Sequence, residues 1–305
     1  MKVGIFYTSF SKSQTPSNKD AVMGAFAQGV RACGDQVIEI REKSEIPDVD
    51  IGLVLGYTLS NNYRGRIIET LRARGSRIVF IDSNIFSYKI KNVDYHRYSL
   101  DTVYPSTGTY FFNKELDLQK WPIISKYHKL ELKPWRQQGN HILVLAQRTL
   151  SWNMLGKDGN EWTIDIIKRL KHFTLRPIIV RLHPGDTKYN DINSKKIKDV
   201  FGGSVTISSK KNIEDDLKNA WISVGYNSTP NCVSAIEGVP VYLDTPLDSW
   251  AKDVAFTDLS MIENPSMPDR TQWIHRLSNI HWKNDEVAEG KLFFNIKNYI
   301  CSFQK

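Results

Sequence analysis

The chain has 305 residues, with a hydrophobic content of 41% and a charged content of 24%, which is typical of a globular protein of about two domains. No run reaches the roughly 20 apolar residues of a membrane span, and the amino terminus lacks the apolar region of a signal peptide. The three cysteines, Cys33, Cys232 and Cys301, are far apart, so neither a disulfide framework nor a zinc site is indicated. We therefore expect a cytoplasmic protein without a metal.

Positive charge is concentrated in the first half of the chain. The net charge is +8, and residues 1–140 contain 20 Lys and Arg against 14 Asp and Glu. Residues 141–305 contain 21 against 19. An excess of this kind favours a polyanionic partner such as nucleic acid, although it can also serve solubility alone.

The first half alternates between strand and helix patterns. Strands are predicted at residues 3–8, 36–40, 51–55 and 77–82, and helices from Asp20 to Gly34 and over 67–75. This alternation predicts a parallel sheet with helices on both faces. Residues 83–120 are predicted to be irregular, with short strands at most. A helix is expected over 121–132, and residues 133–140 are the expected linker.

The second half repeats the alternation. Strands are predicted at residues 141–146, 177–182, 204–207, 221–224 and 239–244, with helices between them and a closing amphipathic helix over 292–300. The fold class is therefore α/β, with two Rossmann-like domains, a cleft between them and a C-terminal helix. The expected boundaries are 1–135 for the first domain, 141–285 for the second, and 286–305 for a helix that packs back toward the first.

Polar residues follow three strands of the second half. Arg148 follows the strand 141–146, His183 follows 177–182, and residues 227–229 (Asn227, Ser228 and Thr229) follow 221–224. Because the carboxyl ends of parallel strands meet at one edge, and hydroxyls at a helix start favour an anion, we predict a diphosphate site there. The alternatives are a surface ion pair for Arg148, a local partner for His183 and plain helix capping for the hydroxyls.

Further donor contacts are predicted around this site. Arg181 and Gly185 flank His183 in the sequence. Asn212, the expected cap of a helix, and Ile213 lie where a nucleobase edge could be read. Glu237 is placed to accept from a ribose hydroxyl, with a solvated glutamate as the alternative. There is no G-x-G-x-x-G, Walker or G-x-S-x-G motif, which argues against dinucleotide, ATP and serine-hydrolase sites.

Two groups in the first half are candidates for work on an acceptor. Asp82 directly follows the strand 77–82 and Asp20 follows the loop after the first strand, so either could serve as a general base. A basic surface that tracks phosphates and stacks bases is predicted from the following residues, with a solvated basic face and buried tyrosines as the alternative: Arg64, Arg66, Arg72, Arg74, Tyr95, His96 and Arg97.

The pairing of His183-Pro184 with Ser228-Thr229 resembles the HP and S/T motifs of GT-B glycosyltransferases, which include sialyl-, Kdo- and capsule-type enzymes and CDP-glycerol transferases. The resemblance implies that these residues contact the donor phosphate. It also implies a nucleoside-diphosphate sugar, expected to be a UDP-sugar, as co-substrate, with no other cofactor.

Residues 131–136 (ELKPWR), 139–142 (GNHI), 147–148 (QR) and 181–185 (RLHPG) are similar to glycosyltransferase-like proteins of tailed phages related to the T-even group. This second resemblance implies DNA as the partner, in the host cytoplasm. The predicted reaction moves arabinose or glucose to a hydroxymethyl or hydroxyl group of modified cytosine. The alternatives are a transferase for a capsule, lipopolysaccharide or teichoic-type polymer, and a non-catalytic nucleic-acid-binding protein on a GT-B scaffold.

Overall fold

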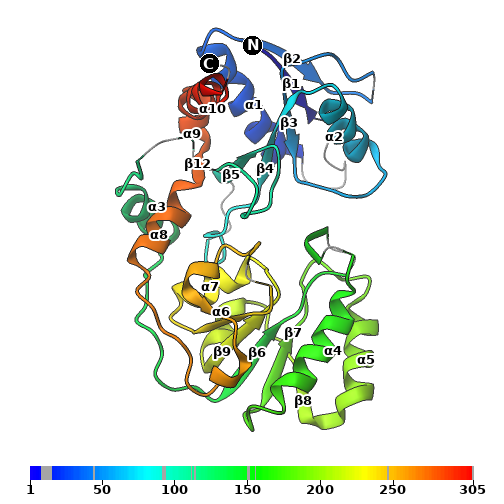
Figure 1. Cartoon of the computed structure of the whole chain (residues 1–305), viewed down its shortest axis with the longest axis vertical. Helices are drawn as coiled ribbons and strands as arrows, with labels where there is room; N and C mark the ends of the chain where they lie inside the picture. The colour runs from blue at the N-terminus through cyan, green and yellow to red at the C-terminus, as the bar shows by residue number, and fades with distance from the viewer. Residues whose placement is uncertain are drawn as a thin grey trace. The chain divides into compact units, whose positions relative to one another are not determined.

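The structure is a computed structural model that describes residues 1–7, 16–43, 45–90, 94–110, 112, 115–149, 152–154, 156–245 and 247–303. The predicted Thr8 strand end lies outside these residues. The chain forms two compact units (Figure 1): unit 1 comprises Met1–Ile124 and Ile274–Lys305, and unit 2 comprises Ser125–Trp273. Within the described residues, no helix is long and apolar enough to cross a membrane.

Unit 1 is built on a six-stranded sheet. Its strands, in spatial order, are β12 (His281–Lys283), β5 (Tyr95–Leu100), β4 (Arg77–Asp82), β3 (Ile51–Leu55), β1 (Lys2–Phe6) and β2 (Gln36–Ile40). The four strands β4, β3, β1 and β2 are parallel to one another. Strand β5 runs antiparallel to β4, and β12 runs antiparallel to β5. The parallel strands β1, β3 and β4 are largely apolar runs because helices cover both of their faces.

Helices pack on the two faces of this sheet. The helices that unit 1 contains or shares are α1 (Pro16–Ala32), α2 (Tyr63–Ala73), α3 (Lys120–His128), α8 (Thr271–Asn279), α9 (Asn284–Ala288) and α10 (Lys291–Ser302). One core joins α1, α9 and α10 to the sheet, with Phe26 against Phe293 at 5.9 Å between ring centroids. On the α2 side, Leu71 packs where Gly52 leaves room, since a Cβ on Gly52 would lie 2.4 Å from Leu71 Cδ1.

The segment 83–120, predicted to be irregular, contains the six-residue strand β5. It pairs with β4 on one side and with β12, from the far end of the chain, on the other. Its sequence, YHRYSL, has no clean alternation of apolar and polar residues. The strand is stabilised by pairing on both sides, with one partner from the far end of the chain, so local patterns did not reveal it.

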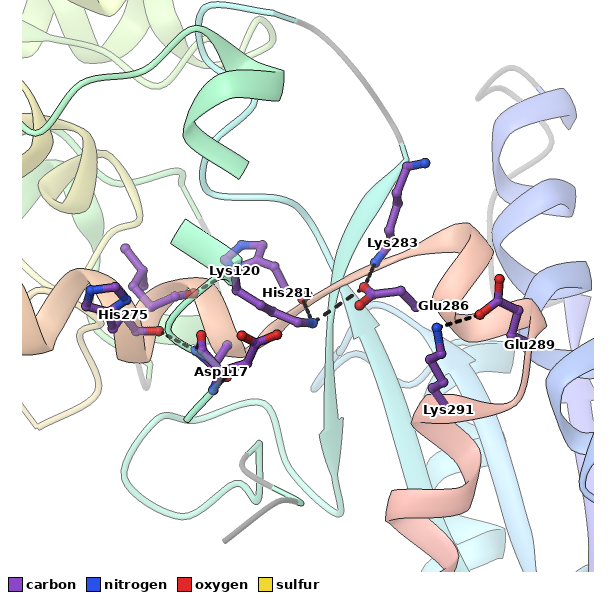
Figure 2. Close-up of polar contacts among 10 residues, drawn as sticks. Asp117, Lys120, His275, His281, Lys283, Glu286, Glu289 and Lys291 are labelled. Atoms are coloured by element: carbon purple, nitrogen blue, oxygen red, sulfur yellow. Dashed lines mark hydrogen bonds and ion pairs between the residues drawn. The ribbon is translucent and has the colours of Figure 1, made fainter. Parts of the chain in front are cut away.

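A polar cluster ties the carboxyl-terminal segment of unit 1 to the rest of it (Figure 2). The Lys120 ammonium donates to the His281 carbonyl at 2.8 Å and lies 4.0 Å from the centroid of the Trp282 ring. It also donates to Glu286 at 3.4 Å, and burial lowers the pKa of Lys120. Asp117 and Asn279 exchange two hydrogen bonds of 2.8 and 2.9 Å. These contacts fix β12 and α9 at the edge of the sheet.

Unit 1 should become less stable at acid pH because His96 is buried in it. Burial lowers the pKa of His96 to about 4, against the opposing pull of Asp82 and Asp94. Between that value and the ordinary value near 6.5 the unfolded chain binds more protons than the folded chain, so stability falls as the pH drops through this window, by up to about 3 kcal/mol. Urea midpoints at pH 7 and pH 4 should show this loss in the native protein and a smaller one in His96→Gln. An equal loss in both would exclude His96 as its source.

Unit 2 is a doubly wound parallel sheet. Its strands, in spatial order, are β11 (Ala255–Phe256), β10 (Val241–Leu243), β9 (Ala220–Gly225), β6 (His141–Leu145), β7 (Ile178–Arg181) and β8 (Val205–Ile207). Numbered within the unit, this is the order 6-5-4-1-2-3. The helices are α4 (Gly159–Leu170), α5 (Asn190–Phe201), α6 (Ile213–Leu217) and α7 (Pro230–Ile236).

The unit boundaries differ from the predicted domain boundaries. The chain passes from unit 1 to unit 2 inside α3 and returns inside α8. The predicted linker 133–140 belongs to unit 2, because the Lys133 N–H donates to the Ile236 carbonyl and Arg136 donates to the carbonyls of Gly238 and Ala220. These bonds, two from backbone N–H groups and one from the Arg136 guanidinium, could not be predicted from a segment rich in Pro, Gly and Gln. Residues 274–285 lie in unit 1, together with α10.

Candidate functional site

Strands β7, β6 and β9 end side by side at the carboxyl edge of the unit 2 sheet. In the register of the sheet, Leu145 pairs with Arg181 on one side and with Gly225 on the other. The strand order reverses between β6 and β9, and open α/β sheets bind ligands outside the carboxyl ends at such a switch point. The residues that follow these three strands are therefore the candidates for a binding site.

His183 is held with one ring nitrogen available as a donor. Its Nδ1 accepts a hydrogen bond of 3.0 Å from the Gly185 N–H, so the proton of the neutral ring is on Nε2. Burial and the nearby Arg148 guanidinium lower the pKa of His183, against the effect of Asp186. The ring is therefore neutral at pH 7, and its Nε2–H can donate to an anion.

Gly185 lies close against the His183 ring. A Cβ at this position would lie 3.2 Å from His183 Cε1 and 3.3 Å from its Nδ1, which is tighter than ordinary van der Waals contact. In addition to its predicted contact with the donor, Gly185 therefore positions His183. Its N–H donates to the imidazole, and its lack of a side chain leaves space for the ring.

Asp186 joins the loops after β6 and β7. Its buried carboxylate accepts from the Thr149 N–H at 2.9 Å, and its own N–H donates to the His183 carbonyl at 3.0 Å. Asn193 adds a bond of 3.0 Å to the Thr149 hydroxyl. These contacts hold the segment carrying Arg148 beside His183. Sequence reasoning missed Asp186, since its place after His183-Pro184-Gly185 was the only signal.

A second set of hydrogen bonds connects the loops after β6 and β9. The buried Gln147 amide donates to Asn227 Oδ1 at 3.1 Å, and Asn227 donates to the Asn153 carbonyl at 3.0 Å. Asn227, predicted to contact the donor, is thus engaged within the protein. Ser228 and Thr229 follow it, half-buried, and Thr229 makes no side-chain capping bond. The structure therefore brings Arg148, His183, Ser228 and Thr229 to one edge.

The same edge differs from a dinucleotide site. The start of α4 follows the first strand of the sheet, the usual pyrophosphate position, but Asp158 caps it and accepts from the N–H groups of Asn160 and Glu161 at 2.7 and 2.9 Å. The end of β7, where an acid would bind ribose, carries Arg181 and His183 instead. A phosphate at this edge would meet the side chains after β6 and β7 rather than the α4 start.

Arg181 is a correction to the predicted donor set. Its guanidinium pairs with Asp216 at 2.5 Å and donates to the carbonyls of Lys210, Lys211 and Asn212. These four acceptors occupy the group, so it clamps the loop before α6. Asn212 stands at the N-cap of α6 without a side-chain capping bond, and Ile213 begins that helix. The base-reading role of both residues stays a prediction.

Glu237 is a second correction. It ends α7, which follows the carboxyl end of β9 and returns the chain to the opposite, amino edge of the sheet. There its buried carboxylate pairs with Lys133. Arg136, close by, donates to the carbonyl of Ala220, the first residue of β9. Because a crossover helix reverses direction, Glu237 cannot share a ribose with His183.

The two predicted bases lie in different settings in unit 1. Asp82 ends β4 as predicted, but it pairs with the buried Arg97 at 2.6 Å and accepts from the Ser83 N–H at 2.7 Å. Asp20 is not at a strand end, because α1 already begins at Pro16; its carboxylate lies 3.9 Å from Arg41. Neither contact tests the catalytic role, which remains a prediction for both.

The predicted nucleic-acid surface is not assembled. Tyr95 and Arg97 are 4% and 3% exposed, because β5 lies inside the sheet between β4 and β12, and His96 is largely buried beside them. Buried side chains cannot track phosphates. The tyrosine and arginine assignments are therefore wrong, and the alternative of buried tyrosines holds here.

The arginines of α2 do not form one face. Arg64 is half-buried beside Gly56, whereas Arg66 is exposed and lies 5.8 Å from the Tyr63 ring. Arg72 and Arg74, both exposed, donate to the carbonyls of Asp101 and Ile46 at 3.3 and 2.7 Å. Arg64 and Arg66 are two positions apart, as are Arg72 and Arg74, which places the members of each pair on roughly opposite sides of the helix, so the four guanidiniums cannot line a single phosphate track.

No protein-family profile matches the chain, and no curated protein sequence matches it. Its structure is similar to two solved structures of KpsC from Thermosulfurimonas dismutans. The β-Kdo 2,4-transferase matches with a TM-score of 0.56 and 12% identity, covering 91% of this chain and 90% of that chain. The β-Kdo 2,7-transferase matches with a TM-score of 0.53 and 13% identity, covering 98% of each. The predicted fold is confirmed: this chain has a GT-B-like α/β fold with two parallel-sheet units.

Proposed function

We propose that the protein is a glycosyltransferase that moves a sugar from a nucleotide-activated donor to a hydroxyl of an acidic glycan. The observation that carries the proposal is the neutral imidazole of His183, with its Nε2–H available beside Arg148, at the switch point of unit 2. The GT-B-like fold shared with two Kdo transferases supports the reaction class.

In this reaction the acceptor oxygen attacks the anomeric carbon of the sugar, and the bond from that carbon to the donor phosphate oxygen breaks. Negative charge then develops on the departing phosphate. The His183 Nε2–H and the Arg148 guanidinium would stabilise that charge, with the hydroxyls of Ser228 and Thr229 as further donors. The acceptor proton passes to a base, for which Asp82 and Asp20 remain candidates.

An acidic glycan suits the chain better than DNA as the acceptor. The positive excess of residues 1–140 favours a polyanion of either kind. The burial of Tyr95 and Arg97 removes the stacking and phosphate contacts on which the DNA hypothesis depended. The two structural neighbours are named as transferases of Kdo, an acidic sugar, and neither name mentions nucleic acid.

The donor site can be tested by calorimetry. His183→Ala should weaken the binding of the matching nucleotide, from a panel of uridine and cytidine mono- and diphosphates, about tenfold or more, because a hydrogen bond to a charged phosphate is lost. His172→Ala, at an exposed histidine of the same unit, is the matched control and should bind like the native protein. Equal affinity for His183→Ala would exclude the phosphate role.

The acceptor can be tested by mass. The protein is incubated with nucleotide sugars and either an oligosaccharide that ends in an acidic sugar or hydroxymethylcytosine DNA. A mass gain on the oligosaccharide supports the proposal. A gain on the DNA alone would replace the glycan acceptor by the nucleic acid, and no gain on either would remove the support for transfer.

A further inference from the structure

The loop between α4 and β7, residues 171–177, exposes two large apolar side chains. Leu175 is fully exposed, and Phe173 is 45% exposed. Thr174 between them is buried: its hydroxyl donates to Glu263 and accepts from the Arg176 N–H at 3.1 Å. The exposure of Phe173 and Leu175 therefore belongs to a loop that is held in place from within unit 2.

Beside these side chains lies a hollow of about 430 Å³, lined by Lys171, His172, Phe173, Thr174, Leu175 and Glu263. Two apolar groups in a fixed loop, next to a hollow, do not contribute to the core of unit 2. Exposed apolar groups that gather in this way mark a surface for contact with another molecule.

The surroundings of the loop are cationic. Residues 166–177, the end of α4 and the loop, contain no Asp or Glu but four Lys and Arg, of which Arg169 and Arg176 are paired with Asp244 and Glu263. Of these, Lys168 and Lys171 are exposed, and the Lys171 ammonium donates to the Ser204 hydroxyl at 3.0 Å. Glu263 is the acid of the hollow, and it is already paired with Arg176 at 2.9 Å. The rim of the apolar loop therefore complements a negatively charged partner.

We propose that the α4–β7 loop docks unit 2 on an anionic lipid bilayer. Phe173 and Leu175 enter the boundary between headgroups and acyl chains, and Lys168 and Lys171 contact the anionic headgroups. Two apolar side chains are few for a stable protein interface, which needs about 800 Å² from each partner. They are sufficient for a bilayer, where a few side chains can insert. This docking is independent of the proposed reaction.

Vesicle co-sedimentation tests this proposal. The native protein should bind vesicles of phosphatidylcholine mixed with phosphatidylglycerol and bind much less to phosphatidylcholine alone. Phe173→Ser combined with Leu175→Ser should weaken binding about tenfold or more. Lys168→Gln and Lys171→Gln should each weaken it about fivefold. The matched control is Leu247→Ser, at another exposed leucine of unit 2 (68% exposed), which should leave binding unchanged.

All five positions are exposed, so the variants should keep the native thermal midpoint, which is measured alongside. Anionic vesicles that fail to bind the native protein would overturn the proposal. So would a double-serine variant that binds like the native protein, or equal binding to vesicles without phosphatidylglycerol. The loss of both apolar side chains with no effect would instead point to a purely electrostatic contact, which also contradicts docking by the loop.

Discussion

Gly29→Ala is expected to destabilise unit 1 by about 3 kcal/mol or more, at the upper end of the effects of overpacking. A Cβ on Gly29 would lie 2.1 Å from the carbonyl oxygen of Val287 and 3.3 Å from the Gly290 Cα. These are backbone atoms, so they cannot rotate away as a side chain would. The substitution must push α9 away from α1, and the buried packing of Phe26 against Phe293 then opens.

Gly24→Ala in the same helix is the matched control. Its Cβ would meet nothing nearer than the Tyr7 hydroxyl at 4.0 Å. Alanine favours a helix over glycine by about 1 kcal/mol, so this variant should be slightly more stable than the native protein. Urea unfolding of the three proteins gives the comparison. Similar midpoints for Gly29→Ala and Gly24→Ala would mean that α1 and α9 are not in backbone contact.

Three of the four parallel strands of unit 1 could be predicted to the residue, whereas β1, predicted at residues 3–8, is Lys2–Phe6. The predicted strands 36–40, 51–55 and 77–82 coincide with β2, β3 and β4. Apolar runs bounded by glycine or charged residues identify strands that are buried on both faces. The antiparallel edge could not be predicted, because β12 has three residues and β5 has a mixed composition. Each depends on a partner that lies about 180 residues away in the chain.

At the candidate site, position along the strand could be predicted and hydrogen bonding could not. Arg148 and His183 follow neighbouring strands, and the edge rule for parallel sheets brings them together. Asp186 and Gln147 hold the loops in place, yet a buried aspartate or glutamine in a loop has no distinct pattern. The ribose contact predicted for Glu237 is wrong because α7 carries the chain from the carboxyl edge to the amino edge of the sheet, where Glu237 pairs with Lys133.

Replacing Arg181 by methionine is expected to lower the free energy of unfolding by about 3–5 kcal/mol, because one partner of a buried ion pair is removed. The Asp216 side chain is 3% exposed and would lose its cation, although the Ser208 hydroxyl would still donate to it. The loop before α6 would lose its clamp as well. The free energy of unfolding of Arg181→Lys should lie between those of the native protein and Arg181→Met, since an ammonium cannot reach four acceptors at once.

Arg148→Ala should show the opposite pattern. Arg148 is exposed, so its loss should change stability by no more than about 0.5 kcal/mol. Nucleotide binding, measured by calorimetry, should nevertheless weaken about tenfold, because the Arg148 guanidinium lies near enough to His183 to lower its pKa and is proposed to bind the same phosphate. A stable Arg181→Met protein that had lost nucleotide binding would reverse these roles.

Comparing the Arg148 and Arg181 variants is informative because the two arginines lie at the carboxyl ends of neighbouring strands. Arg181 is the last residue of β7, in register with Leu145, and its side chain turns to α6. Arg148 lies three residues beyond Leu145, where the chain has left the sheet and the side chain can reach a ligand.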